Sequence, residues 1–447
     1  MKLLTIGLIC WAWVWSCSPA WTQPPQSGGQ LALKEAIDVA LKNHPAIIEF
    51  REKTQAAKAQ IGIAQSNYFP QIRYSSEYDY GTLFGGATTD FDTTFLSTPS
   101  GTGSFSLPSR GGGPSDYFSH RFTLNQLLYD FGKTPGQVAE SKANYQATNY
   151  DYANTRQQVV LNAKTSYFGY LATKRAVEVS EKNVELNQEL VRQAQGFYRA
   201  GIRARIDVAK AEANLYDAES ALIEAKNAFK ISKVTLMNAL GLKTWPYTDL
   251  KDILDVQPIP ISLEEARKLA FQRRPELLKN LSQQQSSQAA VQVAQSGYLP
   301  TLSASGIHSW RGSDYPLREG WTVGVGITFP LFEGLSTVND VRRAKSTLRS
   351  VEANEQVIRQ DITKEVEESY LDLVAAAEKI RARAKALESA QENLRLARGR
   401  YQAGIGSIIE VTDAQVQFFD SELNHIRSLY DHKVARAQLE KVIGTPY

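Results

Sequence analysis

Two carboxylates near the start of the last predicted helix, Glu410 and Asp413, are the first candidates for functional side chains. They are three positions apart, so a helix carries both on one face. The segment from Ser407 to Glu410 has the spacing of a capping box, which explains Glu410 as part of a helix N-terminus. Asp413 lies beyond the usual capping positions. Two interpretations stay open for it, an acid that lines a pore and an ordinary solvated helix acid.

Motifs that carry catalysis are missing from the sequence. It contains no Gly-x-Ser-x-Gly elbow, no Walker loop and no His-Glu-x-x-His zinc motif. Gly324 and Gly326 lie inside a predicted strand, where a phosphate-binding loop is not expected. We therefore expect no catalytic residue, no metal site, no cofactor and no enzymatic activity.

The helices that hold these acids are long, and the most continuous is predicted over residues 135–199. Apolar residues recur in it every seven positions, at Ala163, Tyr170, Val177, Val184, Val191 and Tyr198. This spacing is typical of a coiled-coil seam. Thr134 is its predicted N-cap, with Pro135 in the first turn and Gln137 completing a capping box. At 1.5 Å per residue such a rod is roughly 95 Å long, so it requires partner helices alongside.

The partner helices come from an internal repeat. A shift of 203 residues carries the seven-residue stripe onto a second apolar stripe at Val366, Leu373, Ile380, Leu387, Leu394 and Tyr401. The same shift carries Asp207 onto Glu410. Upstream a shift of 230 residues applies, and it carries Tyr68-Phe69-Pro70 onto Tyr298-Leu299-Pro300. Two registers kept over such a span indicate a tandem repeat.

Two histidines depart from the repeat pattern. His425 and His432 share a helix face and occupy the repeat positions of Leu222 and Phe229. A pH-sensing or metal-binding role is the alternative, but partly exposed packing positions are the favoured interpretation.

Four stretches alternate between apolar and polar residues and are predicted strands, at about 70–80, 116–127, 300–310 and 320–331. In the first, Ile72, Tyr74 and Tyr78 fall on one face, while Arg73 and Glu77 fall on the other. An apolar face opposite a charged face is typical of a transmembrane β-barrel. Four strands are too few to close a barrel, so the chain is expected to oligomerise.

The domain organisation follows from these elements. We expect a signal peptide at 1–20, a linker at 21–30, a first repeat at 31–241, an inter-repeat linker at 242–260 and a second repeat at 261–444. Residues 81–115, rich in glycine, serine, threonine and proline, are expected to form a long exposed loop. The formal net charge of +3 makes no general case for nucleic-acid binding.

The amino terminus contains both cysteines of the chain, Cys10 and Cys17. An apolar run followed by small residues is typical of a secretory signal. Cleavage after Ala20 and acylation of Cys17, within a sequence that resembles a bacterial lipobox, are the two alternatives. Cys17 is therefore a candidate lipid anchor.

Tyr-x-Ala-Gly segments end both long helices, from Tyr198 to Gly201 and from Tyr401 to Gly404. Each glycine is predicted to end its helix in the left-handed conformation, with positive φ. A docking role for these turns is compatible with that structural one.

Together, these features resemble the TolC-type outer-membrane efflux protein family, also called outer-membrane factors. The residues that carry the resemblance are Leu33–Ala40 with Leu263–Ala270, Tyr68-Phe69-Pro70 with Tyr298-Leu299-Pro300, Leu128-Tyr129-Asp130 with Leu331-Phe332-Glu333, and the two Tyr-x-Ala-Gly turns. Each motif alone is weak, but their order and duplication are specific.

The resemblance implies a mainly α fold with a membrane part: a homotrimer with one twelve-stranded β-barrel, continued by twelve helices as a periplasmic α-barrel. It implies a passive duct in the bacterial outer membrane, in contact with lipid, joined through a periplasmic adaptor to an inner-membrane pump. Asp413 and Glu410 would constrict the periplasmic entrance. Asp207 would supply half of a second acidic ring, because Lys210 stands opposite Asp413 in the repeat. Tyr198, Gly201, Tyr401 and Gly404 would form the adaptor-facing turns.

Three functional hypotheses remain. The favoured one is an efflux duct for small molecules. The second is a duct of the same fold that serves type I protein secretion, and the third is a coiled-coil envelope protein without a pore. Strand alternation argues against the third, and no residue separates the first two, so the transported substrate and the pump class stay open.

Overall fold

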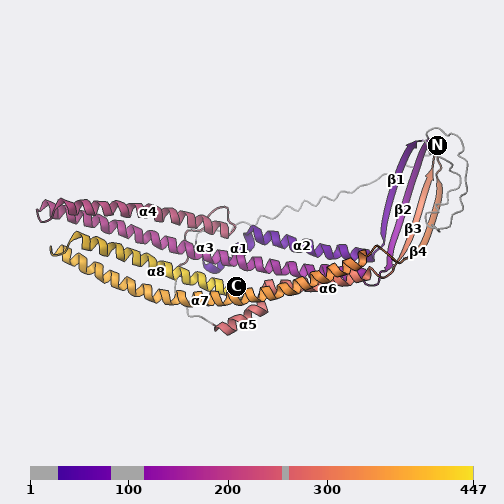
Figure 1. Cartoon of the computed structure of the whole chain (residues 1–447). Helices are drawn as coiled ribbons and strands as arrows, with labels where there is room; N and C mark the ends of the chain where they lie inside the picture. Colours follow the sequence, from indigo (N-terminus) through magenta and orange to yellow (C-terminus); the bar gives the residue numbers. More distant parts are fainter. Residues whose placement is uncertain (1–28, 82–114, 254–260, 446–447) are drawn as a thin grey trace. The chain divides into compact units, whose positions relative to one another are not determined.

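The computed structural model describes residues 29–81, 115–253 and 261–445 (Figure 1). The described part of the chain is mostly helical. Its elements are α1 (Leu33–Asn43), α2 (Pro45–Gln65), the short 3-10 helix η1 (Ser66–Tyr68), β1 (Gln71–Gly81), β2 (Ser115–Tyr129), α3 (Lys133–Arg199), α4 (Arg205–Ala239), α5 (Leu263–Arg273), α6 (Pro275–Ser296), β3 (Thr301–Gly312), β4 (Arg318–Thr328), α7 (Ser336–Gln402) and α8 (Ile408–Val442). The expected signal peptide, Cys17 and nearly all of both the 21–30 linker and the 81–115 loop lie outside the described residues.

The chain divides into two compact units, and α3, α7 and α8 contribute residues to both. The first, here called the hairpin unit, comprises the described residues of Met1–Lys42, Ala163–Asp255 and Arg383–Tyr430. The second, here called the sheet unit, comprises those of Asn43–Asn162, Val256–Ala382 and Asp431–Tyr447. Within the described ranges, no helix combines the length and the low charge that a membrane-spanning helix needs.

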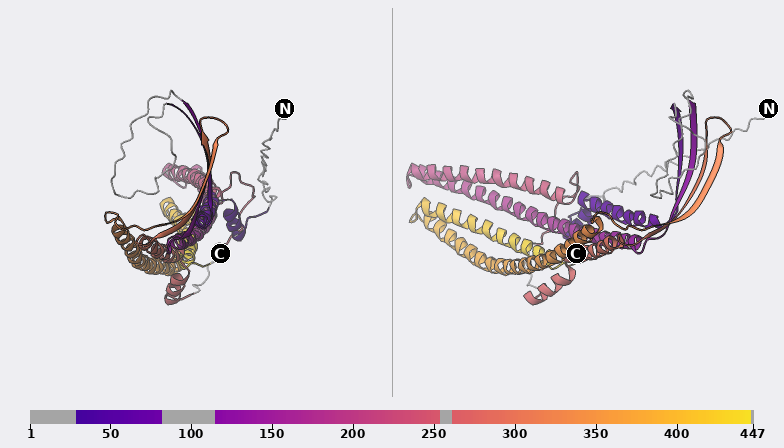
Figure 2. Two further views of the ribbon diagram at one scale, coloured as in Figure 1. Left: turned by 90° about the vertical axis from the view of Figure 1, so that its right-hand side faces the viewer. Right: turned by 45° about the vertical axis from the view of Figure 1, so that its right-hand side comes forward.

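The sheet unit contains one antiparallel sheet with the strand order β1-β2-β3-β4 (Figures 1 and 2). Large apolar side chains share one face of this sheet: Tyr74 pairs in register with Phe122, and their rings are 4.8 Å apart. On β4, Val323 and Val325 are exposed on the same face, opposite Gly306 and Ala304 of β3. The alternation read from the sequence therefore becomes one exposed apolar face and one polar face.

At the starts of both α3 and α7, an acid four residues before a threonine accepts a hydrogen bond from it. The Asp130 carboxylate accepts hydrogen bonds from the amide and the hydroxyl of Thr134, and the Glu333 carboxylate accepts one from the Thr337 hydroxyl at 2.8 Å. The prediction of Thr134 as N-cap was wrong, because α3 already begins at Lys133 and the acid four residues before Thr134 satisfies its amide. Gln137 does not complete a capping box; its carbonyl accepts from Asn67.

In the hairpin unit, α4 lies beside the second half of α3, and α8 lies beside the last part of α7 (Figures 1 and 2). Tyr170 of α3 packs against Phe229 of α4 with ring centroids 4.9 Å apart. The Tyr167 hydroxyl is 2.9 Å and 2.8 Å from the carbonyl oxygens of Leu31 and Lys251, so it ties both flanking segments to α3. Burial raises the pKa of Tyr167 above its usual value, which keeps the hydroxyl neutral.

The sheet unit has its own apolar core, formed by α5, α6, α7 and the end of α8. Its buried members are Ala266, Ala270, Leu277, Ile362, Val366, Leu373, Leu439, Val442 and Ile443. On the same end of α8, His432 is only 1% exposed. The expectation of a partly exposed position was wrong for this histidine, because it takes a packing position as Phe229 does in the first repeat.

Candidate functional site

The ends of the two helical hairpins hold most of the predicted functional residues. The turn between α3 and α4 contains Gly201 with φ +72°, and the turn between α7 and α8 contains Gly404 with φ +78°. The amide after each glycine bonds back to the end of its helix, from Ile202 to the Phe197 carbonyl at 2.9 Å and from Ile405 to the Arg400 carbonyl at 3.1 Å. The positive φ predicted for both glycines is confirmed, and both helices end in the expected left-handed closure.

One side chain links the two turns. The Arg203 guanidinium donates to the carbonyl oxygens of Gly404 at 3.0 Å and Gly406 at 2.6 Å. A shift of 203 residues carries Arg203 onto Gly406. The repeat therefore places a guanidinium donor in the first turn, whereas the equivalent glycine of the second turn offers only its backbone carbonyl. A side chain at Gly406 would force neighbouring atoms to move, because its Cβ would lie 2.9 Å from the Arg400 Cβ. The small residue therefore keeps this turn tight, and the arginine holds it to its neighbour.

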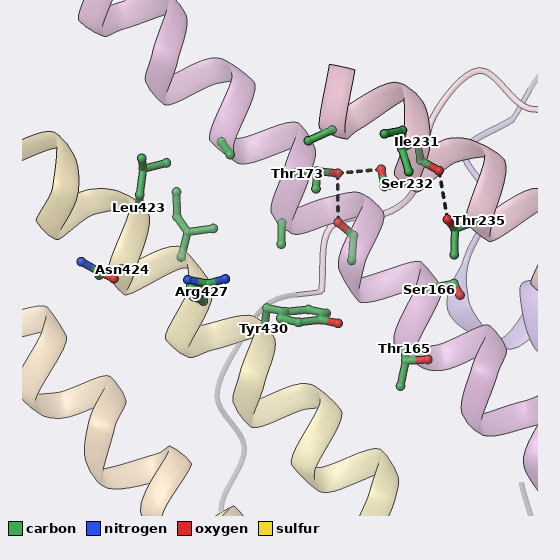
Figure 3. Close-up of a pocket in the computed structure, with 15 residues that line it drawn as sticks. Thr165, Ser166, Thr173, Ile231, Ser232, Thr235, Leu423, Asn424, Arg427 and Tyr430 are labelled. Atoms are coloured by element: carbon green, nitrogen blue, oxygen red, sulfur yellow. Dashed lines mark hydrogen bonds between the residues drawn. The ribbon is translucent and has the colours of Figure 1, made fainter. Parts of the chain in front are cut away.

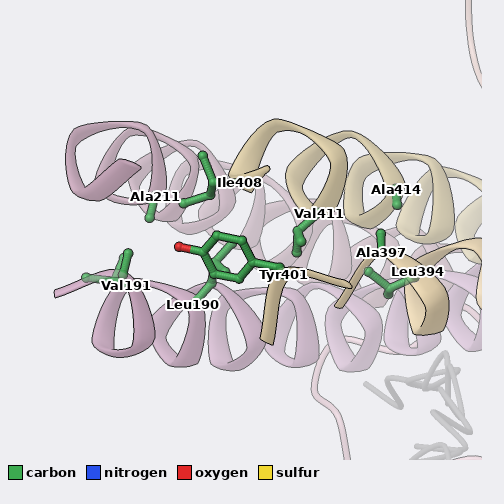
Figure 4. Close-up of a cluster of buried hydrophobic side chains, with 10 residues drawn as sticks. Leu190, Val191, Ala211, Leu394, Ala397, Tyr401, Ile408, Val411 and Ala414 are labelled. Atoms are coloured by element: carbon green, nitrogen blue, oxygen red, sulfur yellow. The ribbon is translucent and has the colours of Figure 1, made fainter. Parts of the chain in front are cut away.

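Beneath the turns lies a cluster of apolar side chains from all four helices (Figure 4). Its buried members are Leu190, Val191, Ala194, Ala211, Leu394, Ala397, Tyr401, Ile408, Val411 and Ala414. The last two members of the predicted α7 stripe, Leu394 and Tyr401, are both in this cluster. Burial of these side chains gives the hairpin ends a common core, since each helix alone exposes an apolar face.

Tyr401 is the largest side chain in this cluster and is 1% exposed. Its ring meets Phe197 edge-on at 5.6 Å, and the Arg203 guanidinium lies 5.4 Å from the ring centroid. Burial raises the pKa of Tyr401, the Asp207 carboxylate adds to this effect, and Arg203 opposes it. The structure thus brings together Tyr401 of the second repeat with Arg203 and Asp207 of the first.

Three large apolar side chains are exposed in the two turns and the last helical turn of α3. Ile202 and Ile405, one in each turn, are 62% and 72% exposed, and Tyr198 is 47% exposed. Tyr198 therefore points out of the cluster that encloses its repeat partner Tyr401. A partner that contacts these turns meets Tyr198 and the two isoleucines, while Tyr401 supports them from below.

The predicted entrance acids have different surroundings. The Glu410 amide donates a hydrogen bond to the Ser407 hydroxyl oxygen at 3.2 Å, the cap that was predicted, and the Glu410 carboxylate pairs with Arg400 at 3.2 Å. Both ends of that ion pair are about half exposed, so it contributes little to stability. Asp413 is exposed and makes no side-chain hydrogen bond or ion pair with the residues that the structure describes. Of these two acids, Asp413 is therefore the one whose charge has no partner among the described residues.

A groove between α3, α4 and α8 in the hairpin unit has a volume of about 720 Å³ (Figure 3). Small residues line it, and the Thr173 and Ser232 hydroxyls lie 2.7 Å apart across the α3–α4 interface. Arg427 is the one charged side chain of its lining. This lining offers no acid–base pair and no nucleophile beside a base, so the groove does not have the chemistry of an active site. Among the described residues, no group of three His, Cys, Asp or Glu side chains could hold a metal ion.

Sequence reasoning missed Arg203, which is the contact that joins the two turns. A signal was present: the repeat aligns an arginine in one turn with a glycine in the other, although the flanking Tyr-x-Ala-Gly motifs match.

Known proteins resemble this chain over nearly its whole length. The sequence profile of the family described as outer membrane efflux protein matches residues 36–242 and 266–445. The outer membrane efflux protein BepC of Brucella suis is 24% identical over 424 residues, which cover 93% of this chain and 87% of BepC. The alkaline protease secretion protein AprF of Pseudomonas aeruginosa is 22% identical over 424 residues, which cover 93% of this chain and 84% of AprF.

The fold is also found among solved structures. The crystal structure of the Campylobacter jejuni CmeC outer membrane channel matches with a TM-score of 0.77 at 20% identity, over 92% of this chain and 85% of that one. At this level of identity the likeness shows a shared fold.

Proposed function

The chain belongs to the outer membrane efflux protein family, and we propose that three copies of it form the exit duct of a tripartite efflux system. The duct is passive, and an inner-membrane pump expels small molecules through it by way of a periplasmic adaptor. The protein is an outer-membrane protein with a large periplasmic helical part, as its relatives are.

The sheet is the observation that carries this proposal. One face exposes a continuous set of large apolar side chains, among them Ile72, Trp321, Val323, Val325 and Ile327. Such a face is costly in water and favourable in lipid. The outer strands β1 and β4 each have one neighbour within the described chain, and an open edge in lipid leaves backbone groups unpaired. Three sheets joined edge to edge would give the proposed twelve-stranded barrel.

The hairpin ends are proposed as the periplasmic entrance. Asp413 would face the axis, with Glu410 and Asp207 beside it, and three copies of each would form an acidic constriction. Carboxylates roughly 8 Å apart in water repel by only about 0.5 kcal/mol, so such a ring is tolerable. The exposed turns at Gly201 and Gly404 would contact the adaptor. Cys17 is proposed as a lipid anchor that would add to membrane attachment.

Type I protein secretion is the second candidate, and the similarity to AprF favours it. The duct would be the same, and the pump would decide the cargo. Copurification of the adaptor and pump with a tagged chain separates the two functions.

A pair of lysine substitutions on β4 tests the barrel. Val325→Lys places a charge on the apolar face and is expected to cost about 2–4 kcal/mol if it lies near mid-bilayer. Thr322→Lys, three residues away on the polar face, is the matched control and is expected to cost little. Heat-modifiable trimer bands in outer-membrane fractions measure the outcome, and equal losses of trimer in the two variants would contradict the assignment of the faces.

A further inference from the structure

The polar face of the sheet is strongly basic. It carries Arg73 on β1, Arg121 on β2, Arg311 on β3 and Arg318 on β4. The acids on the same face within the described strands are Glu77 and Asp79 of β1. Because directly paired residues share a face, the register assigns these six side chains to one surface without further assumption.

Arg311 and Arg318 have no directly paired acid on this face. Arg311 and Arg318 are direct cross-strand partners, and like charges directly opposite destabilise a strand pair. Ser119 separates Arg311 from Glu77 along the same row of the sheet. In the part of the chain that the structure describes, none of the four guanidinium groups forms an ion pair or a side-chain hydrogen bond.

The neighbouring side chains leave these arginines accessible. On β4, Gly320, Gly324 and Gly326 occupy the polar face, and a Cβ added at any of them would meet nothing within 4 Å. Ser119, which pairs with Arg311, supplies a hydroxyl donor beside the charge. A planar guanidinium pair next to a hydroxyl matches the oxygens of carboxylate, sulfonate or phosphate groups.

We propose that this face binds anionic groups, such as phosphate or sulfonate, centred on the Arg311–Arg318 pair with Arg121 beside it. The proposal rests on the function proposed above, since the polar face lines the lumen only in a closed barrel. Three such faces around one lumen would concentrate anions, because a confined charged wall raises the local counter-ion concentration roughly 10-fold or more.

Block of the purified, reconstituted channel by inorganic pyrophosphate tests the proposal. Pyrophosphate is expected to reduce the single-channel current in potassium chloride. The double variant Arg311→Gln/Arg318→Gln should require about tenfold more pyrophosphate for the same block. The variant Arg311→Lys/Arg318→Lys, which keeps the charge without the planar group, should fall between the two.

Glu319→Gln is the matched control, because it removes a charge next to Arg318 on the opposite face of β4 and should leave the block unchanged. Equal block of the wild type and the Arg→Gln double variant would overturn the proposal, as would an equal change in Glu319→Gln. A chain that assembles no trimer and conducts no current would instead contradict the exit-duct function, and this proposal would fail with it.

Discussion

The two hairpin ends share a backbone closure, but equivalent side chains around it have different surroundings. Tyr198 and Tyr401 are repeat equivalents, yet Tyr198 is 47% exposed and Tyr401 is 1% exposed. Gly201 and Gly404 both have positive φ. The two repeats therefore share the conformation of the turn, whereas the burial of the side chains around it depends on contacts between the repeats.

The same divergence extends to charge. Asp207 and Lys210 of the first hairpin correspond to Glu410 and Asp413 of the second. At these two equivalent positions, the second hairpin therefore has two acids and the first has an acid and a lysine. If the two hairpins have become complementary, substitutions at equivalent positions should have different effects.

The largest expected difference is at the two tyrosines. Tyr401→Ala removes a fully buried ring from the cluster of Figure 4 and is expected to lower the free energy of unfolding by about 3–5 kcal/mol. Tyr198→Ala should cost less than about 1 kcal/mol, because its ring is half in water. Thermal loss of the helical circular-dichroism signal measures both, and similar shifts would contradict the asymmetry.

The glycines come next. Gly406→Ala is expected to cost about 1–3 kcal/mol, because its Cβ would press on the backbone of Arg400 and Tyr401. Gly404→Ala should cost about 1 kcal/mol through its positive φ alone, since no atom lies within 4 Å of the added Cβ. The same melting measurement ranks them, and a Gly406→Ala protein as stable as the wild type would remove the constraint.

Arg203→Gln is expected to cost about 1–2 kcal/mol, because it removes charge-assisted hydrogen bonds to two carbonyl groups. The sharper readout is local: amide hydrogen exchange in the turn around Gly404 should accelerate. Arg205→Gln, an exposed neighbour in the first turn of α4, is the control. Unchanged exchange in the Arg203 variant would mean that the two turns are held together by the cluster alone.

Local features of the fold were predictable from the sequence, and contacts between the repeats were not. The Ser407 cap of α8 forms as predicted, because its atoms all lie within four residues. Strand alternation also fixes which face is apolar. The Thr134 prediction failed because Asp130, just outside the motif, competes as the cap with the better acceptor.

The long-range contacts between the repeats are harder to recognise in the sequence. Nothing in the local pattern around Arg203 or Tyr401 states which turn lies beside which, because that depends on four helices packing together. Aligning the two repeats indicated more about these contacts than the residue composition of either repeat did. Phe229 already indicated that the position of His432 is a packing site.

His432 and Phe229 give a smaller, pH-dependent comparison. Burial lowers the pKa of His432, and the nearby Lys433 and Arg436 add to this effect. The unfolded chain then binds a proton more readily than the folded one, so stability should fall as the pH drops below about 6.5. His432→Phe should reduce this loss, measured as melting temperature between neutral and mildly acidic pH. An unchanged pH dependence would mean that other groups cause it.

Asp413 offers the decisive test of the duct, because its charge is free of partners among the described residues and its repeat equivalent is Lys210. The chain has only two cysteines, Cys10 and Cys17, so the double variant Cys10→Ser/Cys17→Ser provides a background in which a new thiol can be labelled alone. In that background, Asp413→Cys and Lys210→Cys channels are reconstituted in planar bilayers and treated with a bulky methanethiosulfonate. If the second hairpins form the constriction, the current through Asp413→Cys channels falls sharply on labelling and that through Lys210→Cys channels falls less. Complete labelling of Asp413→Cys with an unaltered current would contradict an entrance built from the hairpin ends.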